Sequence, residues 1–118
     1  MRLVVSMEEY RRIVEQGELV LVEFYSDSDP LSRYFSRIME DIASRLGPRV
    51  VYVRVNVDMS PEIAESEGVE RVPAALLYYR GSNVWSQEGC LQSYSKDIYV
   101  IRQGIKDSLR RLNVHLRF

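Results

Sequence analysis

The sequence predicts an α/β domain in which helices cover both faces of one mixed β-sheet. Short apolar, β-branched runs alternate along the chain with segments whose apolar residues recur at helical spacing. The last two strand candidates are separated only by a short turn, which predicts an antiparallel hairpin. A chain of 118 residues suffices for one hydrophobic core. We therefore assign residues 1–118 to a single domain, with 113–118 as a C-terminal tail.

The first elements follow from capping signals and hydrophobic patterning. Residues 3–5 are expected to form a short edge strand. Ser6–Glu9 matches a capping box, in which a hydroxyl and a carboxylate satisfy free amides at a helix start, and Gly17 ends that helix. Residues 19–25 form a nearly continuous apolar run, which is typical of a central strand covered on both faces. Glu23 is the exception within it.

The middle of the chain predicts a long helix, a strand and a short helix. Apolar residues recur at helical spacing through residues 31–46. Residues 50–57 are a second β-branched run, and Arg54 is the charge inside it. Ser60-Pro61 indicates an N-cap followed by proline at the first helical position, and this helix is expected to stop at Gly68.

The last third predicts a hairpin followed by a helix. Residues 74–79 and 84–88 are strand candidates joined by a turn at 80–83. The final helix has an apolar stripe within residues 98–112, and Ser95 is expected to cap it. The order is therefore β-α-β-α-β-α-β-β-α. It requires right-handed crossovers between parallel strands and an antiparallel closing hairpin.

Composition excludes several classes of function. Sixteen basic residues against seventeen acidic ones give a formal charge of −1, so we expect neither nucleic acid nor a membrane surface as a partner. No apolar run is long enough to span a bilayer, and the N-terminus leads straight into a capping signal rather than a signal peptide. We therefore expect a cytoplasmic protein. Fourteen of the basic residues are arginine, which fits a thermophilic source or a biased base composition equally well.

Cys90 is the only cysteine and His115 the only histidine. A single cysteine excludes a disulfide framework. One cysteine and one histidine also do not form a metal cluster, and no glycine-rich phosphate loop is present. We therefore predict no metal and no cofactor.

Several short motifs occur at spacings that belong to one pattern. An acid precedes two aromatic residues in Val22-Glu23-Phe24-Tyr25, and a strand ends on a basic–apolar–Asn–apolar–Asp pattern in Arg54-Val55-Asn56-Val57-Asp58. A third segment leads to a proline, Gly68-Val69-Glu70-Arg71-Val72-Pro73. Two glycines complete the pattern, Gly81 in the hairpin turn and Gly89 after the last strand. In this combination the chain resembles the thioredoxin family from about residue 3 to residue 112. The resemblance implies the thioredoxin fold, a mixed sheet of about five strands flanked by four helices.

The chain departs from this family at the redox motif. The position of the family's Cys-x-x-Cys falls on Asp29-Pro30-Leu31-Ser32. Thiol–disulfide exchange needs one thiolate to attack and a second thiol to resolve the mixed disulfide. A carboxylate and a hydroxyl do neither, so we expect dithiol exchange to be lost.

We therefore predict a non-catalytic, thioredoxin-like module that binds a protein or an extended peptide. Its expected binding groove combines the motif position with the segments that the resemblance brings beside it: Ser28, Asp29, Pro30, Leu31, Ser32, Val72, Pro73, Gly89 and Cys90. Two alternatives stay open. One is a monothiol redox protein acting through Cys90 in cell redox homeostasis, and the other is a structural subunit that forms a homodimer.

The resemblance also implies roles for Val72 and Pro73. In the family this proline is cis, and the residue before it offers its backbone to an extended peptide, which binds by strand addition. The alternative is that a cis bond only shapes the turn before a strand. Asp29 likewise has two interpretations, which do not exclude each other. It caps the helix through backbone amides, or it presents a fixed negative charge to a partner.

Glu23 matches the family's buried acid, and Arg54 matches the basic residue near it. With Ser32 in place of the second cysteine, we interpret the two as a structural ion pair. A proton relay to Ser32 is the alternative. Cys90 is interpreted either as a small apolar residue packed at a strand end or as a thiol at the rim of the groove.

Overall fold

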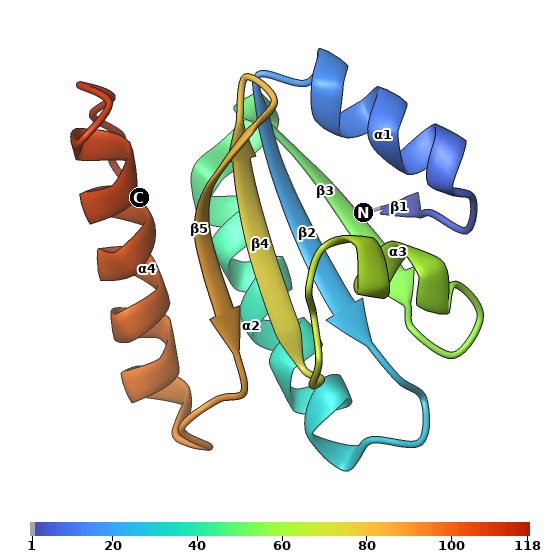
Figure 1. Ribbon diagram of the computed structural model, residues 1–118. Helices are drawn as coiled ribbons and strands as arrows, with labels where there is room; N and C mark the ends of the chain where they lie inside the picture. Colours follow the sequence, from blue (N-terminus) through green and yellow to red (C-terminus); the bar gives the residue numbers. More distant parts are fainter. Residues whose placement is uncertain (1) are drawn as a thin grey trace.

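The computed structural model describes residues 2–118 and contains one five-stranded sheet with four α-helices (Figure 1). The strands are β1 (Arg2–Leu3), β2 (Leu19–Tyr25), β3 (Val50–Asn56), β4 (Ala74–Tyr79) and β5 (Ser82–Glu88). The helices are α1 (Met7–Gln16), α2 (Pro30–Leu46), α3 (Pro61–Ser66) and α4 (Tyr94–Arg110), and a short 3₁₀ turn, Gly47–Arg49, follows α2. The predicted order of elements is confirmed.

The sheet is mixed, as expected, with the strand order β1-β3-β2-β4-β5. Strands β1 and β2 both run parallel to β3, whereas β4 is antiparallel to β2 and to β5. The carboxyl ends of β2 and β5 and the amino end of β4 therefore lie at one end of the sheet. That end carries the motif positions.

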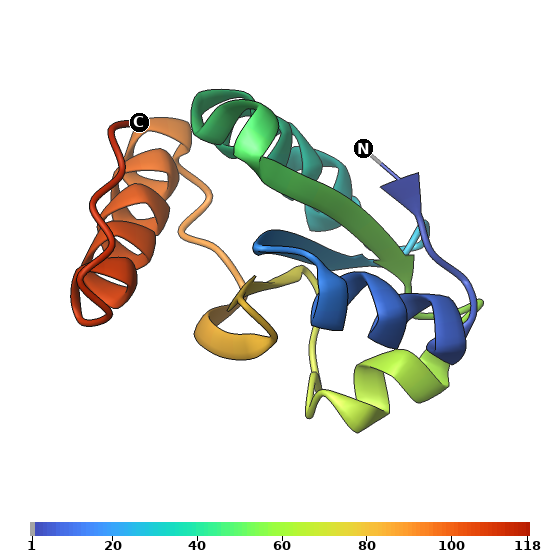
Figure 2. The ribbon, with the colours of Figure 1, turned by 90° about the horizontal axis from the view of Figure 1, so that it is seen from above.

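Two helices cover each face of the sheet, α1 and α3 on one side and α2 and α4 on the other (Figure 2). Alternate residues of β2 supply the two cores, because successive side chains of a strand point to opposite faces. Leu19 and Leu21 pack with α2 and α4, and Val20 and Val22 pack with α1 and α3. The continuous apolar run of β2 is explained by this burial on both sides.

Several predicted boundaries are wrong. The hairpin turn covers residues 80–81 rather than 80–83, because β5 begins at Ser82, which already pairs with Tyr79. The first strand covers Arg2–Leu3 rather than residues 3–5, because the Val5 carbonyl is taken by the Ser60 hydroxyl at 2.7 Å instead of by the sheet. The last helix has Ser93, not Ser95, at its N-cap, because the Asp97 amide already bonds the Ser93 carbonyl at 2.8 Å.

Residues 113–118 pack against the domain. Val114, Leu116 and Phe118 contact the core under α2 and α4, and the Arg102 guanidinium donates to the Phe118 carbonyl from Nε at 3.0 Å. Figure 2 shows this segment running back along α4. Across residues 2–118, no helix is long and apolar enough to cross a bilayer.

Candidate functional site

Three segments that are distant in the sequence meet at the end of the sheet where β2 stops. They are the start of α2, the Val72–Pro73 segment before β4, and the Gly89–Cys90 segment after β5. The Gly89 amide donates to the Pro73 carbonyl at 2.7 Å, which joins the last two segments. Asp29 lies close enough to Cys90 to affect its pKa. The structure therefore brings the residues of the expected binding set together.

Asp29 occupies the N-cap position of α2, and Pro30 is the first helical residue. The expected bonds from backbone amides to the Asp29 carboxylate are wrong, because its Oδ2 instead accepts a hydrogen bond from Ser32 Oγ at 2.9 Å. The Ser32 hydroxyl in turn accepts from the Ser26 amide at 3.2 Å. The two positions that carry cysteines in the family are thus joined by a hydrogen bond.

The loop before α2 is held in place by a second contact. The Ser26 hydroxyl donates to Asp58 Oδ2 at 2.5 Å and lies 2.9 Å from the Ser28 hydroxyl. Asp58 follows β3, so this bond ties the motif loop to the neighbouring strand. The sequence did not indicate this link, because Ser26 and Asp58 are 32 residues apart.

Val72 precedes Pro73 through a cis peptide bond. Within residues 2–118, neither the amide nor the carbonyl of Val72 forms a hydrogen bond. The two residues before Val72 are held differently, because Glu88 Oε1 accepts from the amides of Glu70 at 2.7 Å and Arg71 at 3.3 Å. A fixed segment with one unpaired peptide edge is the element that strand addition requires.

Cys90 is half-buried, and burial raises the pKa of its thiol, with the carboxylates of Asp97 and Asp29 adding to the effect. Asp97 is fully buried and accepts from the Tyr34 hydroxyl at 2.7 Å and from the Leu91 amide at 2.8 Å. The sequence analysis did not single out Asp97, because an acid in the first turn of a helix carries no signal of its burial.

Apolar side chains next to Cys90 face solvent. Leu91 is 58% exposed and Tyr94 is 45% exposed, and the Tyr94 ring meets the Tyr34 ring edge-on at 6.5 Å. Pro30 is exposed at the start of α2, and Leu31 and Val72 are half-buried. We refer to Pro30, Leu31, Val72, Cys90, Leu91 and Tyr94 as the site surface.

Glu23 is fully buried on the α2 side of the sheet, and it lies beside Arg54 in the register of β2 and β3. Its Oε1 is 3.3 Å from Arg54 Nε. The same carboxylate accepts hydrogen bonds from the hydroxyls of Ser36 and Tyr52. Three donors therefore surround this acid, and Ser32 is not one of them. This arrangement favours the structural interpretation of the pair over a proton relay to Ser32.

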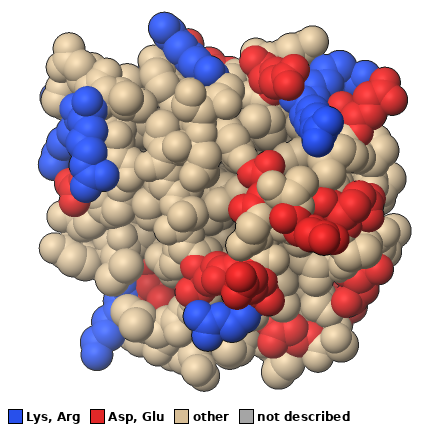
Figure 3. Space-filling model, in the orientation of Figure 1, with Lys and Arg blue, Asp and Glu red and all other residues tan. Residues whose placement is uncertain are grey.

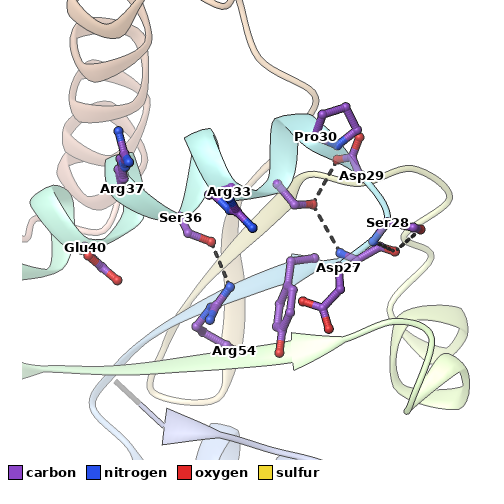
Figure 4. A pocket seen from close by; sticks show the side chains of 12 residues that line it. Asp27, Ser28, Asp29, Pro30, Arg33, Ser36, Arg37, Glu40 and Arg54 are labelled. Atoms are coloured by element: carbon purple, nitrogen blue, oxygen red, sulfur yellow. Dashed lines mark hydrogen bonds between the residues drawn. The ribbon is translucent and has the colours of Figure 1, made fainter.

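A pocket of about 740 Å³ lies on the other side of the start of α2, between this helix and β3 (Figure 4). Three acids and three arginines line it, and it shares four residues with the expected binding set: Ser28, Asp29, Pro30 and Ser32. No motif predicted this pocket, because only the fold places Arg54 opposite α2. Within residues 2–118, no three His, Cys, Asp or Glu side chains are grouped so that they could hold a metal ion.

Comparison with known proteins places this geometry in one family. Residues 2–99 match the sequence model of the family described as Thioredoxin. The chain is 28% identical over 97 residues to Thioredoxin 1 of Plasmodium falciparum, a match that covers 82% of this chain and 92% of that protein. It is 33% identical over 91 residues to Thioredoxin M3, chloroplastic, of Oryza sativa subsp. japonica, covering 75% of this chain and 50% of that protein.

The fold agrees with this relationship. Mitochondrial thioredoxin 3 from Saccharomyces cerevisiae, in its oxidized form, superposes with a TM-score of 0.78 at 21% identity, over 91% of this chain and 94% of that one. The expected thioredoxin fold, with its mixed five-stranded sheet and four helices, is confirmed. On the sequence match and the fold together, the chain belongs to the thioredoxin family.

Proposed function

We propose that this thioredoxin-family protein binds an extended segment of a partner protein at the site surface, without thiol–disulfide exchange. The unpaired backbone of Val72 carries the proposal, because its amide and carbonyl have no partner within residues 2–118. The exposed side chains of Leu91 and Tyr94 lie at the same end of the sheet. Main-chain hydrogen bonds and adjacent apolar contacts are the two components of strand-addition binding.

The chemistry of the motif positions supports binding rather than exchange. Asp29 and Ser32 stand where the family has cysteines, and neither attacks or resolves a disulfide. Cys90 is the only thiol, and its raised pKa keeps it protonated near neutral pH. This counts against the monothiol alternative, because the thiolate is the reactive form.

Surface charge indicates the kind of segment that binds. Figure 3 shows acidic side chains gathered over α3 and around the start of β4. Glu70 and Glu88 are exposed there, and Asp29 is half-exposed. An acidic peptide meets like charge at this surface, whereas apolar residues flanked by Lys or Arg are complementary to it.

Insulin reduction by dithiothreitol tests the loss of exchange. We expect the protein to add nothing to the uncatalysed rate. The double variant Asp29→Cys with Ser32→Cys restores the family motif and is expected to gain turnover, which provides the positive control. Turnover by the unmodified protein that disappears in Cys90→Ala would favour the monothiol alternative and contradict the proposal.

Site-specific photocrosslinking tests the binding surface. A benzoylphenylalanine at Leu91 is expected to form an adduct with a partner in extracts of the source organism, and the adduct resists dithiothreitol. Leu112 is similarly exposed at the far end of α4 and serves as the matched control position. Excess unmodified protein should suppress the adduct, and excess Leu91→Asp should not. Equal adducts at both positions would argue against this surface.

Light scattering separates the homodimer alternative. We expect one mass that is independent of concentration. A mass that doubles with concentration, together with self-adducts at Leu91, would assign the site surface to a second copy of this chain.

A further inference from the structure

We propose that Glu88 is a positioning residue for the peptide edge of Val72. Its carboxylate occupies the backbone amides beside Val72, so that a partner segment pairs with Val72 alone. The inference rests on the function proposed above, because it concerns the same peptide edge. Glu88 is the exposed last residue of β5, and it lies outside the site surface.

The Glu88 carboxylate binds two consecutive amides. Its Oε1 accepts from the amide of Glu70 at 2.7 Å and from the amide of Arg71 at 3.3 Å. The amide before them, that of Val69, donates to a carbonyl of α3 at 2.9 Å. The amide after them belongs to Val72, and of these four it alone has no acceptor in the part of the chain that the structure describes. A partner therefore finds one free donor here instead of three.

The other side of Val72 is held by the backbone at the end of the same strand. The Gly89 amide donates to the Pro73 carbonyl at 2.7 Å, and Ala74 pairs with Glu88 in the register of β4 and β5. In Figure 1 the end of β5 lies beside the start of β4. The end of β5 thus fixes the chain on both sides of Val72, through the Glu88 side chain before it and through backbone bonds after it.

Free amides next to Val72 would weaken partner binding in two ways. A segment that adds as a strand pairs with whichever backbone groups are unpaired, and neighbouring free donors allow it to bind in more than one register. A segment that is not held also loses backbone freedom when the partner binds, which lowers affinity. The Glu88 carboxylate prevents both, because it occupies the two donors and fixes their peptide groups before a partner arrives.

This role depends on where an acceptor oxygen lies and not on the charge of Glu88. Glu88→Gln keeps an oxygen at the same reach and removes the charge. Glu88→Asp keeps the charge but is one methylene shorter, so its oxygens are withdrawn from the amides, and Glu88→Ala removes both. Positioning predicts a mild effect of Gln and strong effects of Asp and Ala. Attraction of Glu88 to a basic partner predicts the reverse for Gln and Asp.

Hydrogen exchange of the ¹⁵N-labelled protein without a partner tests the bonds themselves. The amides of Glu70 and Arg71 are expected to exchange about tenfold faster in Glu88→Ala and in Glu88→Asp, since each amide loses a charged acceptor. Glu88→Gln retains a neutral acceptor and should give a smaller increase. The Val69 amide, which is bonded to α3, is the internal control and should not change. Unchanged exchange at residues 70 and 71 in Glu88→Ala would overturn the inference.

Competition for the Leu91 photoadduct tests binding. The measured quantity is the concentration of unlabelled protein that halves the adduct. It is expected to rise about fivefold or more for Glu88→Ala and Glu88→Asp, as the cost of ordering about one residue implies, and no more than about twofold for Glu88→Gln. Glu62→Ala is the charge control, because Glu62 is exposed on α3 and its side chain forms no hydrogen bond or ion pair within residues 2–118. It should compete as well as the unmodified protein.

The two readouts separate failure of this inference from failure of the proposed function. If the unmodified protein gives no adduct at Leu91, the proposed function is contradicted and the inference with it. Faster exchange at residues 70 and 71 together with undiminished competition by Glu88→Ala contradicts the inference alone. Equal losses of competition in Glu88→Gln and Glu88→Ala, with Glu88→Asp unaffected, would assign Glu88 to charge attraction and also overturn it.

Discussion

Asp29 Oδ2 accepts a hydrogen bond from Ser32 Oγ at 2.9 Å, and these residues stand where the thioredoxin family has its two cysteines. The bond connects the same two positions that a disulfide connects in the family. Unlike a disulfide, it does not respond to reductants. The start of α2 therefore keeps one shape in reducing and oxidising surroundings, which suits a surface that binds without exchange.

Ser32→Ala should lower the free energy of unfolding by about 1–3 kcal/mol, because it leaves the buried Ser26 amide without its acceptor. Urea denaturation followed by circular dichroism measures the change. Ser44→Ala, at an exposed position of the same helix, serves as the control and should change stability by less than about 0.5 kcal/mol. Equal effects of the two variants would mean that the Ser26–Ser32 bond contributes nothing.

Glu23→Ala should lower the free energy of unfolding by about 3–5 kcal/mol, because it leaves the largely buried Arg54 guanidinium without its carboxylate. The control is Glu18→Ala, whose ion pair with Arg49 is exposed and whose loss should cost at most about 1 kcal/mol. Chemical denaturation of both variants measures the difference. A loss at Glu23 no larger than at Glu18 would contradict a structural role for the buried pair.

Alkylation of Cys90 by iodoacetamide should be slow at neutral pH. Its rate should still rise with pH above pH 9, the ordinary pKa of a cysteine thiol. Burial and the two neighbouring carboxylates raise the pKa of Cys90, and only the thiolate reacts. A plot of the alkylation rate against pH, from neutral pH to above pH 9, has its inflection at the pKa of Cys90. Asp29→Asn removes one of the charges that raise the pKa, so its inflection should move to lower pH. An inflection below pH 9 in the unmodified protein would contradict the expected shift.

Gly104→Ala should destabilise the protein and change the fluorescence of Trp85, the only tryptophan. A Cβ at position 104 would lie 2.6 Å from Trp85 Nε1, so the indole must move. Overpacking costs about 1–3 kcal/mol, and the better helix propensity of alanine offsets about 1 kcal/mol of this. Gln103→Ala, at the neighbouring position of α4, should leave the emission spectrum unchanged. An unshifted spectrum in Gly104→Ala would mean that α4 and β5 are not in close contact there.

The order of elements could be predicted because each one depends on local signals. Residues 19–25 are apolar at every position but one, and this fits only a strand buried on both faces. Boundaries were less predictable where a distant group competes for a backbone atom. The Ser60 hydroxyl donates to the Val5 carbonyl, which is therefore not available to the sheet, although Ser60 lies 55 residues away in the sequence.

The family pattern and the absence of a dithiol could be predicted from the sequence, because both depend only on which residues occur and at what spacing. How the substituted positions interact depends on the three-dimensional packing. It directs the Asp29 carboxylate to Ser32 rather than to backbone amides, surrounds Glu23 with three donors, and leaves the Val72 peptide edge unpaired. It also forms the pocket between α2 and β3. These are contacts between groups far apart in the sequence, and their partners are set by the packing of α2 on the sheet.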